Sequence, residues 1–408
     1  MFGHTKLLFK LNEAMFKTSF PSSRSALLGL VISLLALPAT IQAQVRLSEP
    51  EVVFPEDFGA IQTVRALADG KVLVADPLGK ALYLVDLEAG TRTVVGREGQ
   101  GPDEYLQPDA VWALPADSTL LVDLGNGRLA TLGPDLSFGE TQPIALGEPR
   151  MGQPLVLAIP QAVDGAGHLY TRVMGSMGGA FPDSADVVRI DRGTRSYTPV
   201  AKIKLGEMTR TTSGGANNQN VSITPVPLSP EDAWGVASDG SVVVVRSGDY
   251  HVEWIHPDGR VTRGAPVSFQ PIRIRQAEKE EYVAEQARSG GGIRVGVTVE
   301  NGQMSMQFSR GGETEARAID QYPWPEAKPP FYALRIPVDP MGRAWVKRHV
   351  EAGEESTYDV FGPDGDRLNS VLLPHGERVL GFGAGSLFAV AFDEFDLSFL
   401  KRYPMPRF

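Results

Sequence analysis

The stretch GQGPDEYLQPDAVWALPADSTLLVDLGNGRL, which runs from Gly99 to Leu129, decides the class of fold. Its glycines could form a phosphate-binding loop, but such a loop needs a helix directly after it and usually a Lys-Ser or Lys-Thr pair. Here Pro108 and the apolar segment AVWAL follow instead, and a second apolar segment, TLLVD, comes after a turn. The glycines therefore belong to a connection between β-strands, where they permit backbone angles that other residues resist.

A small turn followed by an apolar strand recurs six times along the chain. The six copies begin at Ala68, Pro115, Val163, Ala237, Val338 and Gly383. The turn residues Asp69, Asp117 and Asp164 are spaced by about 48 residues, and one four-stranded propeller blade takes roughly 40–50 residues. Most copies are followed by a second strand-like segment. We therefore predict an all-β fold, namely a six-bladed β-propeller of four-stranded antiparallel blades.

The opening stretch also resembles an NHL repeat. In that family a glycine-rich loop ends in an aromatic residue and a proline, and the strands that follow carry an Asp-Gly turn, a terminal Asp, an Asn and an Arg. The matching residues are Tyr105, Pro108, Asp117, Asp123, Asn126 and Arg128. Ser118 stands where the family has the turn glycine, and the other blades match less well. The resemblance implies an NHL-like six-bladed β-propeller of an exported bacterial type, and no particular activity.

The N-terminus has the pattern of a secretory signal. Four basic residues precede an apolar run from Ala26 to Pro38, and Ala43 suits the last position before cleavage. The run is shorter than the about 20 apolar residues that span a bilayer, although an uncleaved anchor is the alternative. We expect residues 1–43 to be a signal peptide and residues 44–408 to be the propeller. The mature chain would be periplasmic or secreted, with no stable membrane insertion.

Composition and missing motifs narrow the function. The net charge of −10 argues against a nucleic-acid partner, because the phosphate backbone rewards a basic surface. The chain has no cysteine and contains neither a G-x-S-x-G nor an H-E-x-x-H motif, so no catalytic residue is assigned. His168 and His349 could approach each other across a ring, but isolated histidines rarely form a zinc site. Asp76 and Asp123 are interpreted as residues that cap turns rather than as metal ligands.

Three insertions are expected at one end of the ring. They cover about residues 174–186, 206–231 and 269–330, and the last holds one short helix over Gln276–Gly290. In a propeller blade, the turn between the second and third strands and the connection to the next blade open on the same end. We name this end the insertion-bearing rim. Long loops gathered on a rigid scaffold often carry function, although they can also merely cap the channel.

Six residues on this rim are the candidate ligand-binding residues. Arg172, Arg246 and Arg348 end the second strands of blades three, four and five, and the proline-rich segment 319–334 supplies Tyr322, Trp324 and Phe331. The arginines favour an anionic or carboxylate-bearing partner, unless acids of the inserted loops pair with them. Aromatic side chains on a rigid loop are typical anchors of a recognition surface. We expect a cleft over the channel mouth, with Trp324 lining it and Arg246 and Arg348 on its floor.

The sequence favours a binding module that recognises an unidentified ligand or protein on the insertion-bearing rim. No cofactor and no metal ligand are assigned under this hypothesis. The alternative is a metal-dependent hydrolase or lyase, similar to lactonases, with calcium or zinc at the central channel mouth. The sequence leaves open whether the chain is an enzyme. Tightly bound calcium or zinc, at about one ion per chain after dialysis, would favour the alternative.

Overall fold

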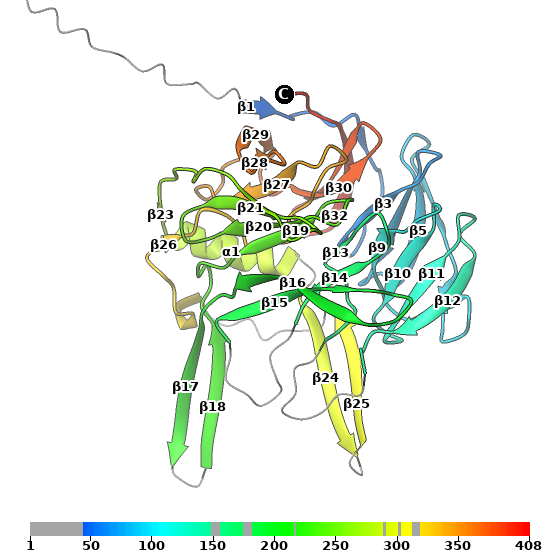
Figure 1. Cartoon of the computed structure of the whole chain (residues 1–408), viewed down its shortest axis with the longest axis horizontal. Helices are drawn as coiled ribbons and strands as arrows, with labels where there is room; N and C mark the ends of the chain where they lie inside the picture. Colours follow the sequence, from blue (N-terminus) through cyan, green and yellow to red (C-terminus); the bar gives the residue numbers. More distant parts are fainter. Residues whose placement is uncertain are drawn as a thin grey trace, which may run out of the picture. The chain divides into compact units, whose positions relative to one another are not determined.

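The strands of the chain form a six-bladed β-propeller, as the repeats predict (Figure 1). The computed structural model describes residues 44–147, 156–173, 182–215, 218–288, 291–300, 303–311 and 319–408. Blade one is built from β3 (Val64–Ala66), β4 (Val72–Asp76), β5 (Ala81–Asp86) and β6 (Thr91–Val94). Blade two is built from β9 (Pro108–Ala113), β10 (Thr119–Asp123), β11 (Arg128–Leu132) and β12 (Phe138–Pro143). Consecutive strands of each blade pair antiparallel.

The next two blades repeat this order. Blade three comprises β13 (Ala162–Val163), β14 (Leu169–Arg172), β15 (Ser184–Ile190) and β16 (Tyr197–Lys204). Blade four comprises β19 (Ala233–Val236), β20 (Val242–Arg246), β21 (His251–Ile255) and β22 (Val261–Arg263). A small parallel pair, β7 (Arg97–Glu98) and β8 (Glu104–Tyr105), lies in the connection between blades one and two, where the sequence predicted a connector.

The N-terminal segment closes the ring in two steps. Blade five holds β27 (Ala344–Arg348), β28 (Ser356–Phe361) and β29 (Arg367–Leu373), and blade six holds β30 (Arg378–Gly383), β31 (Ser386–Phe392) and β32 (Ser398–Pro404). The strand β1 (Gln44–Arg46) adds to β29 in parallel, and β2 (Val52–Val53) pairs antiparallel with β32. The strand β2 therefore completes the sheet of the final blade by pairing with β32.

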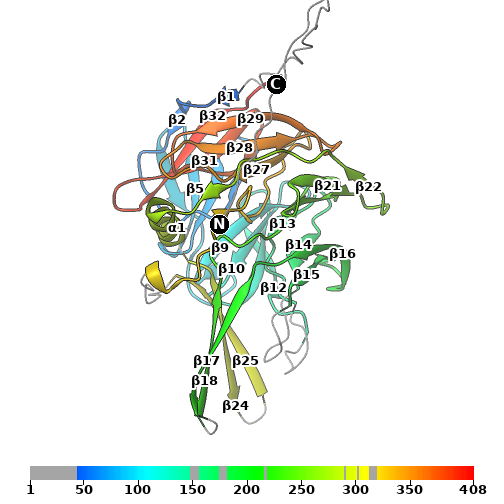
Figure 2. The same ribbon diagram turned by 90° about the vertical axis from the view of Figure 1, so that its left-hand side faces the viewer.

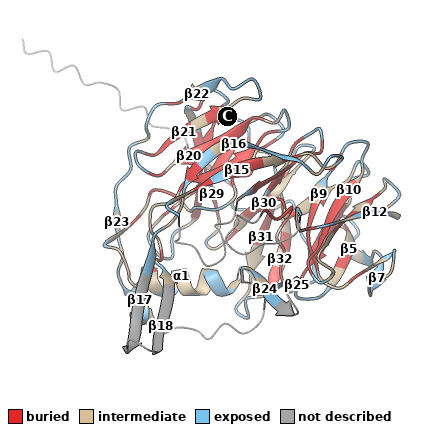
Figure 3. Ribbon diagram, turned by 60° about the horizontal axis from the view of Figure 1, so that its bottom comes forward, coloured by how far each residue is buried: buried red, intermediate tan, exposed pale blue. Residues whose placement is uncertain are grey.

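Alternation along each strand explains why the blades pack into a ring. On β4, Val72 and Val74 belong to an apolar cluster shared with blade six, while Leu73 and Ala75 belong to one shared with blade two. Side chains on a strand point alternately to opposite faces, so an apolar strand without polar interruption is buried on both faces. Six such clusters are found among the described residues, one at each interface between neighbouring blades. The core is therefore distributed between the sheets (Figure 3).

The insertions add two hairpins and the helix. The hairpin of β17 (Met208–Gly215) and β18 (Asn218–Pro225) follows blade three. The long insertion contains β23 (Ile272–Arg273), α1 (Gln276–Arg288), the hairpin of β24 (Ile293–Glu300) and β25 (Gln303–Arg310), η1 (Ile319–Gln321) and β26 (Ala327–Lys328). Both hairpins project from the same side of the blades (Figures 1 and 2). The predicted helix is confirmed by α1, whereas residues 174–181 of the first insertion lie outside the described residues.

In the described part of the chain, no helix is long and apolar enough to cross a membrane.

Candidate functional site

The long insertion is fixed to the blades at both ends. On α1, Glu285 forms an ion pair with Lys347 of blade five at 2.9 Å, and Arg288 forms one with Asp396 beside blade six at 2.7 Å. Acidic residues one turn apart on α1 also face blade five: Glu278 accepts a hydrogen bond from the backbone N–H of Ala352 at 3.3 Å, and Glu281 accepts one from that of Gly353 at 3.3 Å. The helix α1 is therefore held by ion pairs to two neighbouring blades, five and six.

The β24–β25 hairpin is fixed to the opposite side of the ring. Phe308 is buried in the apolar cluster between blades two and three, and Arg310 forms an ion pair with Asp109 of β9. Gln107 binds the backbone of Arg310 twice, as a donor at 2.9 Å and as an acceptor at 2.9 Å. Residues 276–310 thus run from blades five and six to blade two.

A cavity of about 520 Å³ lies in the centre of the ring beneath this hairpin. Residues at or beside the innermost strands of five blades line it, together with Ile293, Val295 and Arg310 of the hairpin. The lining residues from the blades include Thr63, Asp109, Trp112, Gln161, Leu334, Arg335, Ile336, Lys347, Tyr358 and Arg378. We name it the central cavity. Its volume falls within the range of about 300–1,000 Å³ that is usual for ligand pockets.

Five cationic side chains line the central cavity, and three of them have a carboxylate partner. Those three are Arg310 with Asp109, Lys347 with Glu285, and Arg172 with Glu231 at 3.2 Å. The remaining two, Arg335 and Arg378, form no ion pair with any carboxylate in the described ranges. The lining of this cavity is therefore positively charged although the chain as a whole is acidic.

Arg335 and Arg378, the two unpaired residues, are partly buried. Arg335 donates to the carbonyl oxygen of Leu380 at 2.7 Å, and its guanidinium carbon lies 5.1 Å from the ring centre of Trp112. Arg378 donates to the carbonyl oxygen of Ile61 at 2.9 Å. Burial, together with the nearby positive charge of Arg378, lowers the pKa of Arg335 to about 10, and burial also lowers the pKa of Arg378. Both remain cations at neutral pH, with several of their five N–H donors unused.

Two aromatic side chains, Tyr332 and Tyr358, also line the central cavity. Tyr358 is buried, its pKa is raised to about 12 mainly by burial, and its hydroxyl oxygen accepts a hydrogen bond from the backbone of Val379 at 2.9 Å. Tyr332 stacks on His349 with ring centres 3.7 Å apart. Burial and the neighbouring Lys328 and Lys347 keep the pKa of His349 well below its usual range, so this imidazole is neutral.

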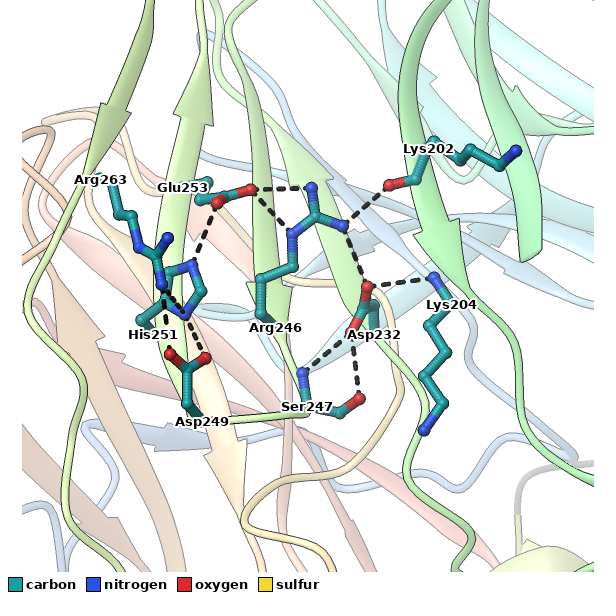
Figure 4. Close-up of polar contacts among 9 residues, drawn as sticks. All are labelled: Lys202, Lys204, Asp232, Arg246, Ser247, Asp249, His251, Glu253 and Arg263. Carbon is teal, nitrogen blue, oxygen red and sulfur yellow. Dashed lines mark hydrogen bonds and ion pairs between the residues drawn. The ribbon is translucent and has the colours of Figure 1, made fainter. Parts of the chain in front are cut away.

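Of the three predicted arginines, only Arg172 lines the central cavity, and it is paired with Glu231 of the second insertion. Arg246 lies outside that cavity in a dense polar network (Figure 4). It contacts Glu253 at 2.7 Å and Asp232 at 3.0 Å, and it also donates to the carbonyl oxygen of Lys202 at 2.8 Å. Arg246 is thus paired with two carboxylates, of which Asp232 lies just after the second insertion and Glu253 lies on β21, and not with an acid of an inserted loop.

Arg348 and the aromatic candidates lie in other places. Arg348 is 3.8 Å from Asp359 and lines a second cavity of about 410 Å³, between Pro330 and His349. Phe331 is only 2% exposed and packs on Tyr250 between blades four and five, so it is a core residue.

The other two aromatic candidates pack on the helix. The ring of Trp324 lies 5.5 Å from that of Tyr282 of α1 and 5.6 Å from that of Tyr322, and its indole nitrogen donates to the carbonyl oxygen of Ile319 at 2.7 Å. Neither Tyr322 nor Trp324 lines either cavity. The structure therefore does not bring Trp324, Arg246 and Arg348 together in one cleft.

Sequence reasoning missed Arg335 and Arg378, which provide the distinctive charge of the site. Each precedes an innermost apolar segment, IPV after Arg335 and VLGF after Arg378. An arginine directly before the innermost apolar segment of two successive blades was the sequence signal that could have identified Arg335 and Arg378. The proposed capping role of two aspartates is confirmed: Asp76 accepts from the backbone of Gly59 at 2.8 Å and of Ala60 at 3.0 Å, and Asp123 accepts from Gln107 at 3.1 Å.

The fold and the central cavity together define a class, that of six-bladed β-propellers with a cationic centre. Solved structures with a similar fold include virginiamycin B lyase from Staphylococcus aureus (9% identity, 88% of this chain and 99% of that chain covered, TM-score 0.38). They also include the calcium-binding protein regucalcin from Agrobacterium tumefaciens (12%, 90% and 100%, TM-score 0.40) and a gluconolactonase from Xanthomonas campestris (10%, 90% and 98%, TM-score 0.39). No protein-family model and no curated protein matches the chain, so the resemblance to NHL repeats stays a prediction.

Proposed function

We propose that this protein is a binding propeller that holds a small anionic ligand in the central cavity. The observation that carries the proposal is the pair Arg335 and Arg378, two cations that line one cavity without a carboxylate partner among the described residues. Burying an unpaired charge is costly, and a fold that needed only stability would place apolar or paired residues there. An anion that enters the cavity supplies the missing partner and uses the free N–H donors.

The charge of the cavity supports an anion over a metal ion. Among the described residues, its lining holds five cations and a single carboxylate, Asp109, which is engaged with Arg310. Calcium and zinc need several convergent oxygen, nitrogen or sulfur ligands, and the described residues contain no group of three or more His, Asp or Glu side chains suited to one. The alternative of a metal-dependent hydrolase or lyase therefore has less support from this cavity. Metal analysis after dialysis tests it directly.

Binding is tested by calorimetric titration of the purified chain with naphthyl phosphate and naphthalene dicarboxylate as probes. We expect binding by the wild type and at least tenfold weaker binding by Arg335→Gln and by Arg378→Gln. The matched control is Arg260→Gln, since Arg260 is an exposed arginine whose nearest carboxylate, Asp258, is 3.9 Å away. Equal affinities in all four proteins, or no binding of either probe by the wild type, would overturn the proposal.

We also propose that the protein is exported, because a basic, apolar and small-residue pattern precedes Gln44. N-terminal sequencing of protein recovered from the periplasm or the medium should begin near Gln44. A mature pool that retains Met1 would contradict this proposal.

A further inference from the structure

We propose that the ligand of the central cavity carries two negative charges on one end and an apolar body on the other. This inference rests on the proposed function and specifies the chemical class of the ligand. Phosphate monoesters and dicarboxylates with an aromatic or aliphatic group share this chemistry.

The number of charges follows from the pairing pattern around the cavity. Three of its five cations are neutralised by Asp109, Glu285 and Glu231, each within ion-pair distance. Two positive charges, those of Arg335 and Arg378, are then left over in the described lining. A ligand with one negative charge would leave a buried cation uncompensated, whereas a doubly negative ligand balances both.

The two guanidinium groups are also placed to act on one ligand. They come from the innermost segments of successive blades, five and six, and Arg335 reaches across to the carbonyl oxygen of Leu380 on β30, the strand that begins with Arg378. Besides burial, the positive charge of Arg378 lowers the pKa of Arg335, and that of Arg310 lowers the pKa of Arg378. These three arginines therefore share one electrostatic environment, in which a dianion relieves the mutual repulsion.

The rest of the cavity wall supplies the apolar contact. Trp112 lies beside Arg335, and Ile293, Leu334 and Ile336 complete the apolar side. Leu334 is 46% exposed although it lies at the cavity, so its side chain is available for contact. Ligand pockets typically combine a mostly apolar wall with a few polar groups that fix the orientation. Inorganic phosphate alone would satisfy the arginines but would leave this wall without a partner.

The test compares probes that differ in one property at a time. Naphthyl phosphate is the doubly charged probe, its methyl ester has the same ring with one charge, and inorganic phosphate has the charge without the ring. The titrations are made at pH 8, where the phosphate monoester is a dianion because its second pKa is about 6. Arg335 is still charged there, since its pKa is about 10. We expect the methyl ester and inorganic phosphate each to bind at least tenfold more weakly than naphthyl phosphate.

The outcomes separate this inference from the proposed function. Equal binding of naphthyl phosphate and its methyl ester, with both weakened in Arg335→Gln, would overturn the dianion while leaving anion binding in place. Equal binding of inorganic phosphate and naphthyl phosphate would overturn the apolar body. Binding that is insensitive to Arg335→Gln and Arg378→Gln would overturn the proposed function itself. A parallel series with naphthalene dicarboxylate and naphthoate distinguishes a dicarboxylate site from a phosphate site.

Discussion

Replacing Arg335 by Gln should make the ligand-free protein more stable while it weakens ligand binding at least tenfold. The folded state holds Arg335 as a cation in a cavity that it shares with Arg378, and neither has a carboxylate partner in the described residues. The unfolded chain holds the same cation in water, where its pKa is ordinary. Gln keeps a donor for the carbonyl oxygen of Leu380 but carries no charge.

The magnitude follows from the pKa of Arg335, which falls from 12.5 to about 10 on folding. A tenfold change in a protonation equilibrium is about 1.4 kcal/mol, so the charge costs the folded state at most about 3–4 kcal/mol. This cost is fully present below pH 10, because there both states are protonated and only the folded state holds the cation unfavourably. Solvent screening in the cavity and the lost contact with Trp112, about 0.5–2 kcal/mol, reduce the gain to about 1 kcal/mol.

Thermal unfolding followed by tryptophan fluorescence is a suitable assay. With an unfolding entropy of about 2.1 cal/mol/K per residue, a gain of about 1 kcal/mol raises the Tm of a chain of this length by roughly 1–2 °C. Arg335→Lys is the matched control, since it keeps the positive charge and should bring no gain. A fall in the Tm of Arg335→Gln by more than about 2 °C would refute the reasoning, because it would make Arg335 a structural cation rather than one held for a ligand.

The remaining predictions concern ring closure, a buried ion pair and a buried histidine. Deletion of residues 44–55 removes β1 and β2 and should lower the Tm sharply in calorimetry; an unchanged melting curve would refute closure by this segment. Asp109→Asn leaves Arg310 without its carboxylate and should cost about 3–5 kcal/mol in urea unfolding, while the double variant with Arg310→Gln should recover part of that loss. His349 has a lowered pKa, so the unfolded state binds its proton first and stability should decline as the pH falls below about 6.5, by up to about 1.4 kcal/mol per pH unit. The variant His349→Phe should lose this dependence between pH 7 and 5, and equal slopes in both proteins would contradict the assignment.

The ring could be predicted from the sequence because its determinants are local. Each turn with Asp and Gly places a glycine at positive φ, as at Gly70 with 86° and Gly240 with 86°, and each strand that follows is apolar on both faces. The apolar strand recurs in every blade and the turn glycine in all but blade two, where Ala116 and Asp117 have positive φ instead, at a spacing that only a few folds accommodate. The strand ends could be placed in the same way, because the capping aspartates Asp76 and Asp123 bind backbone within their own turn or the adjoining connection.

The candidate site depended on contacts that no local pattern encodes. In the sequence, no carboxylate partner is evident for Arg246 at the end of its strand. In the structure, Asp232, which directly follows the second insertion, forms an ion pair with Arg246. Arg335 and Arg378 are 43 positions apart in the sequence and share a cavity only because two successive blades bring their innermost segments together. Phe331 shows the opposite error, because it was expected on a binding surface and is a core residue. The proline-rich segment 319–334 crosses the interface between blades four and five, and Phe331 fills part of that interface.

Closure by the N-terminal segment has a consequence for how the chain folds. Glu51 and Arg402, which meet at this seam, are separated by 351 positions, so β1 has no partner until blade five has been made and β2 has none until blade six has been made. Contacts of such long sequence separation form slowly, because the entropy of closing the loop is lost before the contact is gained. During synthesis the chain therefore carries an open sheet edge on blade six and an unpaired N-terminal segment at the same time. Both are exposed to pairing with a second chain, and the risk of intermolecular strand exchange is greatest in the interval before the last residues become available.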